Sequence, residues 1–170
     1  MRPVAIAAVV LVCGLSAIPA RAQGVVLSGG YQFLAIPEDD TVLPVGWLVS
    51  IAGSPRRVVA PVFEAGTSYR QEDRGRFQLW TVQGGARFSI PPGPAGRPRA
   101  FAQLVGGVIG AGCCRETSAY FVIEPGGGIE WPLGERTAAH IGLGFPIVLT
   151  GDGGAHLVRV HAGVSIRLGR

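Results

Sequence analysis

The sequence predicts an all-β chain that forms an eight-stranded antiparallel up-and-down transmembrane β-barrel. Three observations lead to this prediction. Apolar and polar residues alternate with a period of two, eight such segments are separated by turn-forming residues, and only 15% of the residues are charged. A typical soluble domain has about 25% charged residues. A chain this apolar therefore needs an apolar environment or an unusually large apolar interior.

The first 22 residues are expected to be a secretory signal peptide. Arg2 precedes an apolar stretch from Val4 to about Ala17, and the segment ends in Ala-Arg-Ala at positions 20–22. This stretch is too short to cross a bilayer as a helix. Cys13 lies inside it and is expected to be an apolar residue of the signal and not a site of lipid attachment. The remaining residues, 23–170, have the length of one domain.

The composition does not favour nucleic acid as a partner. All 15 basic residues are arginines, against 11 acidic residues. Loss of Arg2 and Arg21 with the signal would leave a net charge of about +2, and the other arginines are scattered without a basic run. Beyond the signal, no run of 18 apolar residues predicts a transmembrane helix.

Eight segments carry the alternation of period two. In the last of them, Val158, Val160 and Val164 share one face with other apolar residues, and Arg159 and Ser165 lie on the opposite, polar face. The other expected strands cover about 25–33, 45–51, 59–68, 80–89, 100–108, 118–131 and 137–149. The breaks between strands are PEDD, GSPRR, YRQEDRGR, PPGPAGRPR, GCCRET, PLGER and TGDGG. Short connections between consecutive strands predict antiparallel neighbours and an up-and-down barrel.

The composition of the polar faces indicates which side of the wall meets the solvent. A soluble barrel needs many charged residues on its outer face, but here the polar sets are mostly Gly, Ser, Thr and Gln. Small polar residues suit the narrow lumen of an eight-stranded barrel. Strands of about 10 residues, tilted near 45°, also match the apolar thickness of a bilayer. We therefore expect the apolar sets to face lipid.

On these grounds the chain resembles the small bacterial outer-membrane β-barrels of the OmpA-like and OmpX-like group. The resemblance covers residues 23–170 and includes the glycine-rich segments QGGARFS and EPGGGIEW and the closing HAGVSIRLG. It implies a location in a Gram-negative outer membrane, insertion by the barrel-assembly machinery, and both termini in the periplasm. The breaks PEDD, YRQEDRGR, GCCRET and TGDGG would then lie outside the cell. The chain departs from the pattern of the group because it ends Leu-Gly-Arg and not with an aromatic residue.

The charged residues on the polar faces are expected to pair inside the lumen. An isolated charge there would cost several kcal/mol, so equal numbers of acids and bases favour ion pairs. Arg167 and Glu130 are expected to pair near the periplasmic end. The expected lumen network consists of Glu64, Arg87, Glu124, Glu130, Arg159 and Arg167, with His140, His161, Gln83 and Gln103 as further lumen residues.

Other reactive residues suggest no chemistry of their own. His140 and His161 lack a third ligand at a matching height, so no metal site is expected. Ser165, His161 and Glu124 have the residue types of a hydrolase, but they should point away from lipid. Cys113 and Cys114 lie in an expected external loop, where free thiols, a strained bridge between neighbours and links to another chain are all open.

The sequence therefore predicts a non-catalytic integral outer-membrane protein. We expect a structural role in the envelope or a small gated pore, with membrane lipid and the assembly machinery as partners, no cofactor and a monomeric state. The alternative is a soluble exported barrel that binds an apolar ligand, as lipocalins do.

Overall fold

A computed structural model describes residues 24–54, 58–72, 75–90, 97–113, 116–150 and 153–169. The expected signal peptide lies outside the described residues. No helix in these ranges is long and apolar enough to span a membrane. The strands are β1 (Val25–Ile36), β2 (Thr41–Leu43), β3 (Val45–Ala52), β4 (Val59–Glu72), β5 (Gly75–Ser89), β6 (Arg99–Cys113), β7 (Glu116–Pro132), β8 (Thr137–Gly144), β9 (Ile147–Thr150), β10 (Gly153–His156) and β11 (Val158–Leu168).

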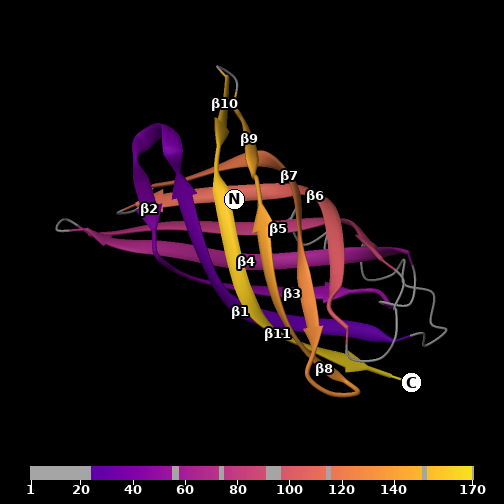
Figure 1. The fold of residues 1–170 in the computed structure, drawn as a ribbon. Coiled ribbons are helices and arrows are strands. Elements are labelled where there is room, and N and C mark those ends of the chain that lie inside the picture. The colour runs from indigo at the N-terminus through magenta and orange to yellow at the C-terminus, as the bar shows by residue number, and fades with distance from the viewer. Residues whose placement is uncertain are drawn as a thin grey trace.

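These strands form one closed antiparallel barrel (Figure 1). Eight of the strands make up its wall, and we call these eight the staves of the barrel. Around the wall the order is β1, β3, β4, β5, β6, β7, β8 and β11, and β11 returns to pair with β1. Val25 lies opposite Leu168, so the chain enters its first strand and leaves its last strand at the same end of the barrel. We call this the terminal end, and the opposite end, where the short helix η1 (Pro37–Asp39) lies, the distal end. The predicted fold class is confirmed.

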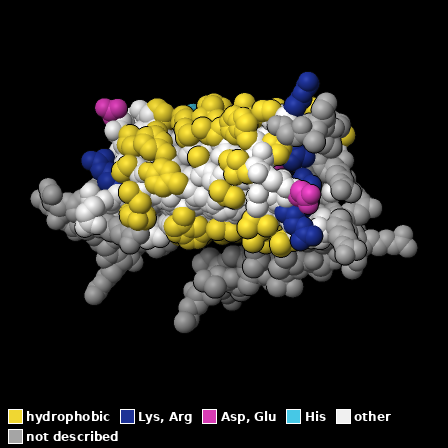
Figure 2. Space-filling model, turned by 60° about the horizontal axis from the view of Figure 1, so that its bottom comes forward, with side chains coloured by type: hydrophobic (Ala, Val, Ile, Leu, Met, Phe, Trp, Pro, Cys, Tyr) yellow, Lys and Arg dark blue, Asp and Glu magenta, His cyan; other side chains and the backbone are white. Residues whose placement is uncertain are grey.

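The alternation of faces is also as predicted. Val164, Ile166 and Leu168 are exposed, whereas Arg159 and Ser165 are buried. The same pattern holds on the other strands, so large apolar side chains cover the outer wall. Figure 2 shows one side of this wall, with hydrophobic side chains along its length and charged ones towards its two ends.

The structure has three short strands that the sequence did not predict as separate elements, β2, β9 and β10, and one predicted strand is divided. Pro44 separates β2 from β3, and the expected strand 137–149 is broken between β8 and β9 at Pro146, which has no N–H to donate. The break is bridged because the Phe145 N–H donates to the Pro125 carbonyl and the Leu157 N–H to the Pro146 carbonyl, both at 2.9 Å. The hairpin β9–β10 points in a different direction from the tips of the long strands (Figure 1).

The strands also run into the predicted connections at the distal end. Residues 69–72 and 75–76 of YRQEDRGR lie in β4 and β5, and parts of GCCRET and TGDGG lie in strands as well. The predicted loop boundaries were wrong because polar residues beyond the apolar band can continue a hydrogen-bonded ladder in water. PEDD was placed correctly, with Pro37 in the first turn of η1 and Asp40 in the left-handed region at φ 50°.

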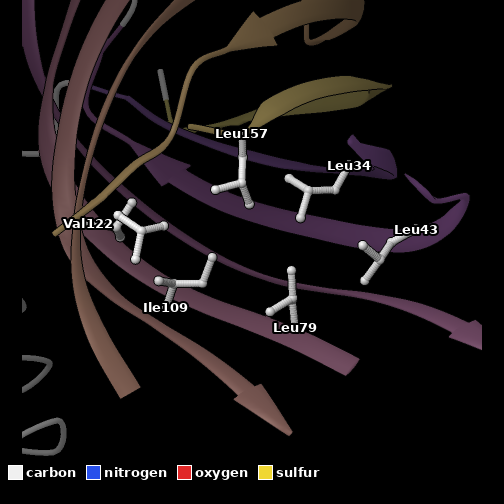
Figure 3. Close-up of a cluster of buried hydrophobic side chains, with 7 residues drawn as sticks. Leu34, Leu43, Leu79, Ile109, Val122 and Leu157 are labelled. Atoms are coloured by element: carbon white, nitrogen blue, oxygen red, sulfur yellow. The ribbon is translucent and has the colours of Figure 1, made fainter. Parts of the chain in front are cut away.

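The lumen contains more apolar residues than the sequence suggested. Seven buried side chains cluster at the distal end. They come from β1, β2, β5, β6, β7 and β9 and from the residue between β10 and β11, and Figure 3 shows six of them pointing towards one another. We call this set the apolar ring: Leu34, Leu43, Leu79, Ile109, Val122, Val148 and Leu157. A smaller cluster of Val26, Ala52, Val62 and Val105 follows one hydrogen-bonded row of β1, β3, β4, β5 and β6.

The assignment of the outer face to lipid predicts how arginine substitutions on that face change the stability of the barrel. Leu104 lies on the outer face of β6, among the apolar residues at mid-height of the wall, and Leu133 lies just after β7 at the terminal end; both are exposed. Leu104→Arg is expected to lower the free energy of unfolding in lipid vesicles by about 2–4 kcal/mol, because the charge enters hydrocarbon. Leu133→Arg is the matched control and is expected to cost about 0–1 kcal/mol at the interface. Equal costs in urea titrations would contradict the assignment of the outer face to lipid.

Candidate functional site: a charged lumen below an apolar ring

The lumen holds three ion pairs at successive heights between the terminal end and the apolar ring. Arg99 Nη2 lies 3.3 Å from Glu130 Oε1, near the terminal end. Arg87 Nη2 lies 3.5 Å from Glu64 Oε1, further inside. Arg159 Nη2 lies 3.2 Å from Glu124 Oε2, close below the ring.

The ion pair between Arg159 and Glu124 is the centre of a network that crosses the lumen. Arg159 Nη1 donates to Gln83 Oε1 at 3.3 Å, and its Nη2 donates to the Thr81 hydroxyl at 3.4 Å. Gln83 Nε2 donates to Glu124 Oε2 at 3.1 Å. Three strands separate β11 from β5 in either direction around the wall, so these bonds join opposite sides of the barrel. The side chains of Arg159 and Glu124 are only 1% and 2% exposed.

Glycines on β8 leave the room that this network needs. A Cβ atom at Gly144 would collide with the Glu124 carboxylate, and one at Gly142 would collide with the His161 ring. Both glycines face the lumen on the stave beside β11. Their presence therefore explains how a carboxylate and an imidazole fit within a barrel of only eight staves.

The second network connects three adjacent staves. Gln103 Oε1 accepts hydrogen bonds from Arg87 Nε at 3.1 Å and Nη2 at 2.9 Å, and Gln103 Nε2 donates to Glu64 Oε1 at 3.1 Å. The Arg87 guanidinium also lies 4.5 Å from the centre of the Phe101 ring. Gln103 thus links the two charges and keeps their geometry fixed.

The structure gives Glu130 a partner that the sequence analysis did not expect. Glu130 forms an ion pair with Arg99 on the neighbouring stave, where the two residues are direct cross-strand partners, and the pairing of Arg167 with Glu130 stays a prediction. Arg99 was missed because it was assigned to the connection PPGPAGRPR, one residue outside its strand. Arg99 has an odd residue number, as Phe101 and Gln103 do, and therefore lies on the same face of β6. Extending the predicted alternation by one residue would have found it.

The histidines and the reactive residues form no catalytic set in the described part of the chain. The rings of His140 and His161 lie 5.7 Å apart, tilted by 58°. The Ser165 hydroxyl donates to the Ala138 carbonyl at 3.3 Å, while Glu124 is bonded to Arg159 and Gln83. No group of three His, Cys, Asp or Glu residues among those described could hold a metal ion. β6 ends at Cys113, and Cys114 lies outside the described residues.

The buried ion pair between Arg159 and Glu124 also makes a prediction about stability. Arg159→Met is expected to lower the free energy of unfolding by about 3–5 kcal/mol, because it leaves the Glu124 carboxylate buried without its counter-charge. Adding Glu124→Leu to this variant is expected to recover part of the loss. Vesicle unfolding curves of the two single variants and the double variant give the coupling energy, and purely additive losses would show that the two residues do not interact.

A matched change at the terminal end should have a smaller effect. The Arg99 and Glu130 side chains are 14% and 17% exposed, so water solvates a charge that loses its partner. Arg99→Met is therefore expected to cost about 1 kcal/mol in the same assay, well below Arg159→Met. An equal or greater loss would contradict the gradient of burial along the lumen.

The comparisons with known proteins agree with this architecture. No protein-family profile matches the chain, and no curated protein matches it in sequence. Among solved structures, Neisserial surface protein A (NspA) superposes with a TM-score of 0.60 at 8% identity, covering 86% of this chain and 96% of that one. The outer membrane protein OprG of Pseudomonas aeruginosa gives 0.59 at 6% identity, covering 88% and 97%. The N-terminal β-barrel domain of OprF from the same species gives 0.56 at 13% identity, covering 86% and 98%.

These likenesses concern the fold, and at that level they confirm the resemblance that the sequence suggested. The predicted outer-membrane location agrees with the structures found. The chain has the fold of the small eight-stranded β-barrels of bacterial outer membranes.

Proposed function

We propose that the protein is an integral outer-membrane barrel without catalytic activity, whose closed lumen gives it a structural role in the envelope. The outer wall supports the membrane location, because its exposed side chains are largely apolar over the length of the strands. The fold is that of outer-membrane barrels such as OprG. Membrane lipid and, during insertion, the barrel-assembly machinery are the partners that this proposal implies, and a single closed barrel suits a monomer.

The observation that carries the proposal is the bridge from Arg159 to the opposite wall. Hydrogen-bonded side chains join β11 to β5 across the lumen, and this supports a lumen that is blocked at that height. Directly above, the apolar ring adds a second barrier, since a narrow constriction lined by apolar side chains opposes the passage of hydrated ions. Two barriers of different chemistry in series support a closed lumen.

A small gated pore is the second candidate. It is favoured by the polar lining below the ring, where charged groups follow one another from the partly exposed Arg99 to the buried Arg159. Opening would require both the ion pair and the apolar ring to move. The soluble lipocalin-like alternative has less support, because it needs a polar outer wall and the observed outer wall is apolar.

Electrical recording separates the structural role from the pore. In planar bilayers the wild-type protein is expected to show only background conductance, and Arg159→Ala is expected to remain at background because the apolar ring still seals the distal end. The double variant Arg159→Ala with Leu79→Ser weakens both barriers and serves as the positive control. Discrete openings of the wild-type protein would favour the gated pore.

Fractionation tests the membrane location independently. The protein is expected to stay in the outer-membrane pellet through a carbonate or urea wash and to require detergent for release. Recovery of the folded protein from the soluble periplasmic fraction would contradict the proposal and favour the soluble barrel.

A further inference from the structure

The outer wall carries a compact group of aromatic and polar side chains towards its distal end, on β1, β3, β4 and β5. Cross-strand register places Tyr31 opposite Trp47, Trp47 opposite Thr67, and Thr67 opposite Trp80. On the next outward position Tyr69 lies opposite Gln78. We call this group the aromatic platform: Tyr31, Trp47, Thr67, Tyr69, Gln78 and Trp80.

Polar groups are built into the platform between its rings. The Thr67 hydroxyl donates to the Leu79 carbonyl at 2.9 Å and accepts a hydrogen bond from Gln78 Nε2 at 3.0 Å. That bond uses only one of the two N–H groups of the Gln78 carboxamide and leaves its oxygen for another partner. A fixed carboxamide on the outer wall suits the region of lipid headgroups, because in hydrocarbon its remaining groups would be costly to bury.

The rings of the platform offer open faces at the wall. Tyr31 is 52% and Trp47 is 51% exposed. Trp80 lies over Gly110, where an added side chain would collide with the indole, so this ring lies close against the sheet. Indole N–H and phenol O–H groups stand beside apolar ring faces, a combination that suits a ligand with both apolar and hydroxylated surfaces.

A general interfacial belt does not account for this one-sided arrangement. Trp and Tyr in such belts are spread around a barrel at both interfaces. The chain has three Trp and three Tyr residues, and four of these six lie in the platform; the other two, Tyr120 and Trp131, lie on β7. Phe121 on β7 and Phe145 just after β8 are also exposed, but they carry no hydrogen-bonding group. The concentration on four neighbouring staves indicates a local binding surface.

We propose that the aromatic platform binds the saccharide headgroup of a glycolipid in the outer leaflet, an inference that rests on the proposed membrane location. A sugar ring has an apolar C–H face that fits an indole or phenol ring, and hydroxyl groups at its rim that fit Gln78 and the ring N–H and O–H groups. The platform contains no Lys or Arg, so it suits a neutral saccharide better than a phosphate.

The wall next to the platform suits the acyl chains of the same lipid. Towards the terminal end, Leu27, Val49 and Ile51 are exposed on β1 and β3. Gly29 lies opposite Val49, and a Cβ atom built there would meet nothing within 4 Å. This shallow apolar strip continues directly from Tyr31 and Trp47, so the headgroup and the chains of one lipid molecule could be held together.

The test uses the purified full chain refolded into three kinds of vesicle: phosphatidylcholine alone, with glucosyl diacylglycerol, and with phosphatidylglycerol. The glycolipid is expected to raise the urea midpoint of unfolding of the wild-type protein, and phosphatidylglycerol is not. Trp47→Leu is expected to abolish the glycolipid-dependent shift. Trp131→Leu, the same substitution of an exposed Trp at the other end of the wall, is the matched control and is expected to keep it.

Tyr31→Phe and Gln78→Leu keep the proposal testable if Trp47→Leu does not fold. Each is expected to reduce the shift while leaving the midpoint in phosphatidylcholine close to that of the wild type. Equal midpoints of the wild-type protein in all three vesicles, or an equal loss of the shift in Trp131→Leu, would overturn the platform as a glycolipid site. Failure of the wild-type protein to insert into any vesicle would instead overturn the proposed membrane location.

Discussion

Closure of the sheet between β1 and β11 is the constraint on which the rest of the structure depends. Within hydrocarbon every backbone N–H and C=O group must find a partner inside the protein, and only a sheet without free edges provides this. The register from Val25 with Leu168 to Ala35 with Val158 supplies these partners along nearly all of β1. Once the sheet closes with eight staves, the width of the lumen is set, and side chains must fill it.

The filling of the lumen follows from that width. Large charged side chains fit because glycines stand beside them, as Gly144 does beside Glu124. Each carboxylate lies within reach of an arginine, and glutamines connect the pairs across and along the wall. Towards the distal end the polar middle is followed by buried apolar side chains, so the interior changes its chemistry with height while the outer wall stays apolar.

Alternation of period two was sufficient to predict the barrel, its eight staves and the two faces, because closure forces every strand to obey the same rule. It could not predict the apolar ring. Leu34 and Leu43 lie on the inward face but fall in or beside an expected break, and an apolar residue at the end of a strand carries no periodic signal of its own. The partners of the charges were also beyond reach, since Arg159 meets Gln83 through the stagger of the strands and not through any spacing in the sequence.

The position of Arg159 on the last stave has a consequence for the order of assembly. Its partners Thr81, Gln83 and Glu124 belong to staves in the middle of the chain. Glu124 therefore lacks its counter-charge until β11 docks, and the bridge across the lumen forms only as the sheet closes. We expect contacts made this late to stabilise the finished barrel more than the transition state, and so to slow unfolding while leaving the rate of folding nearly unchanged. On this expectation the buried pair favours long persistence in a membrane over rapid assembly.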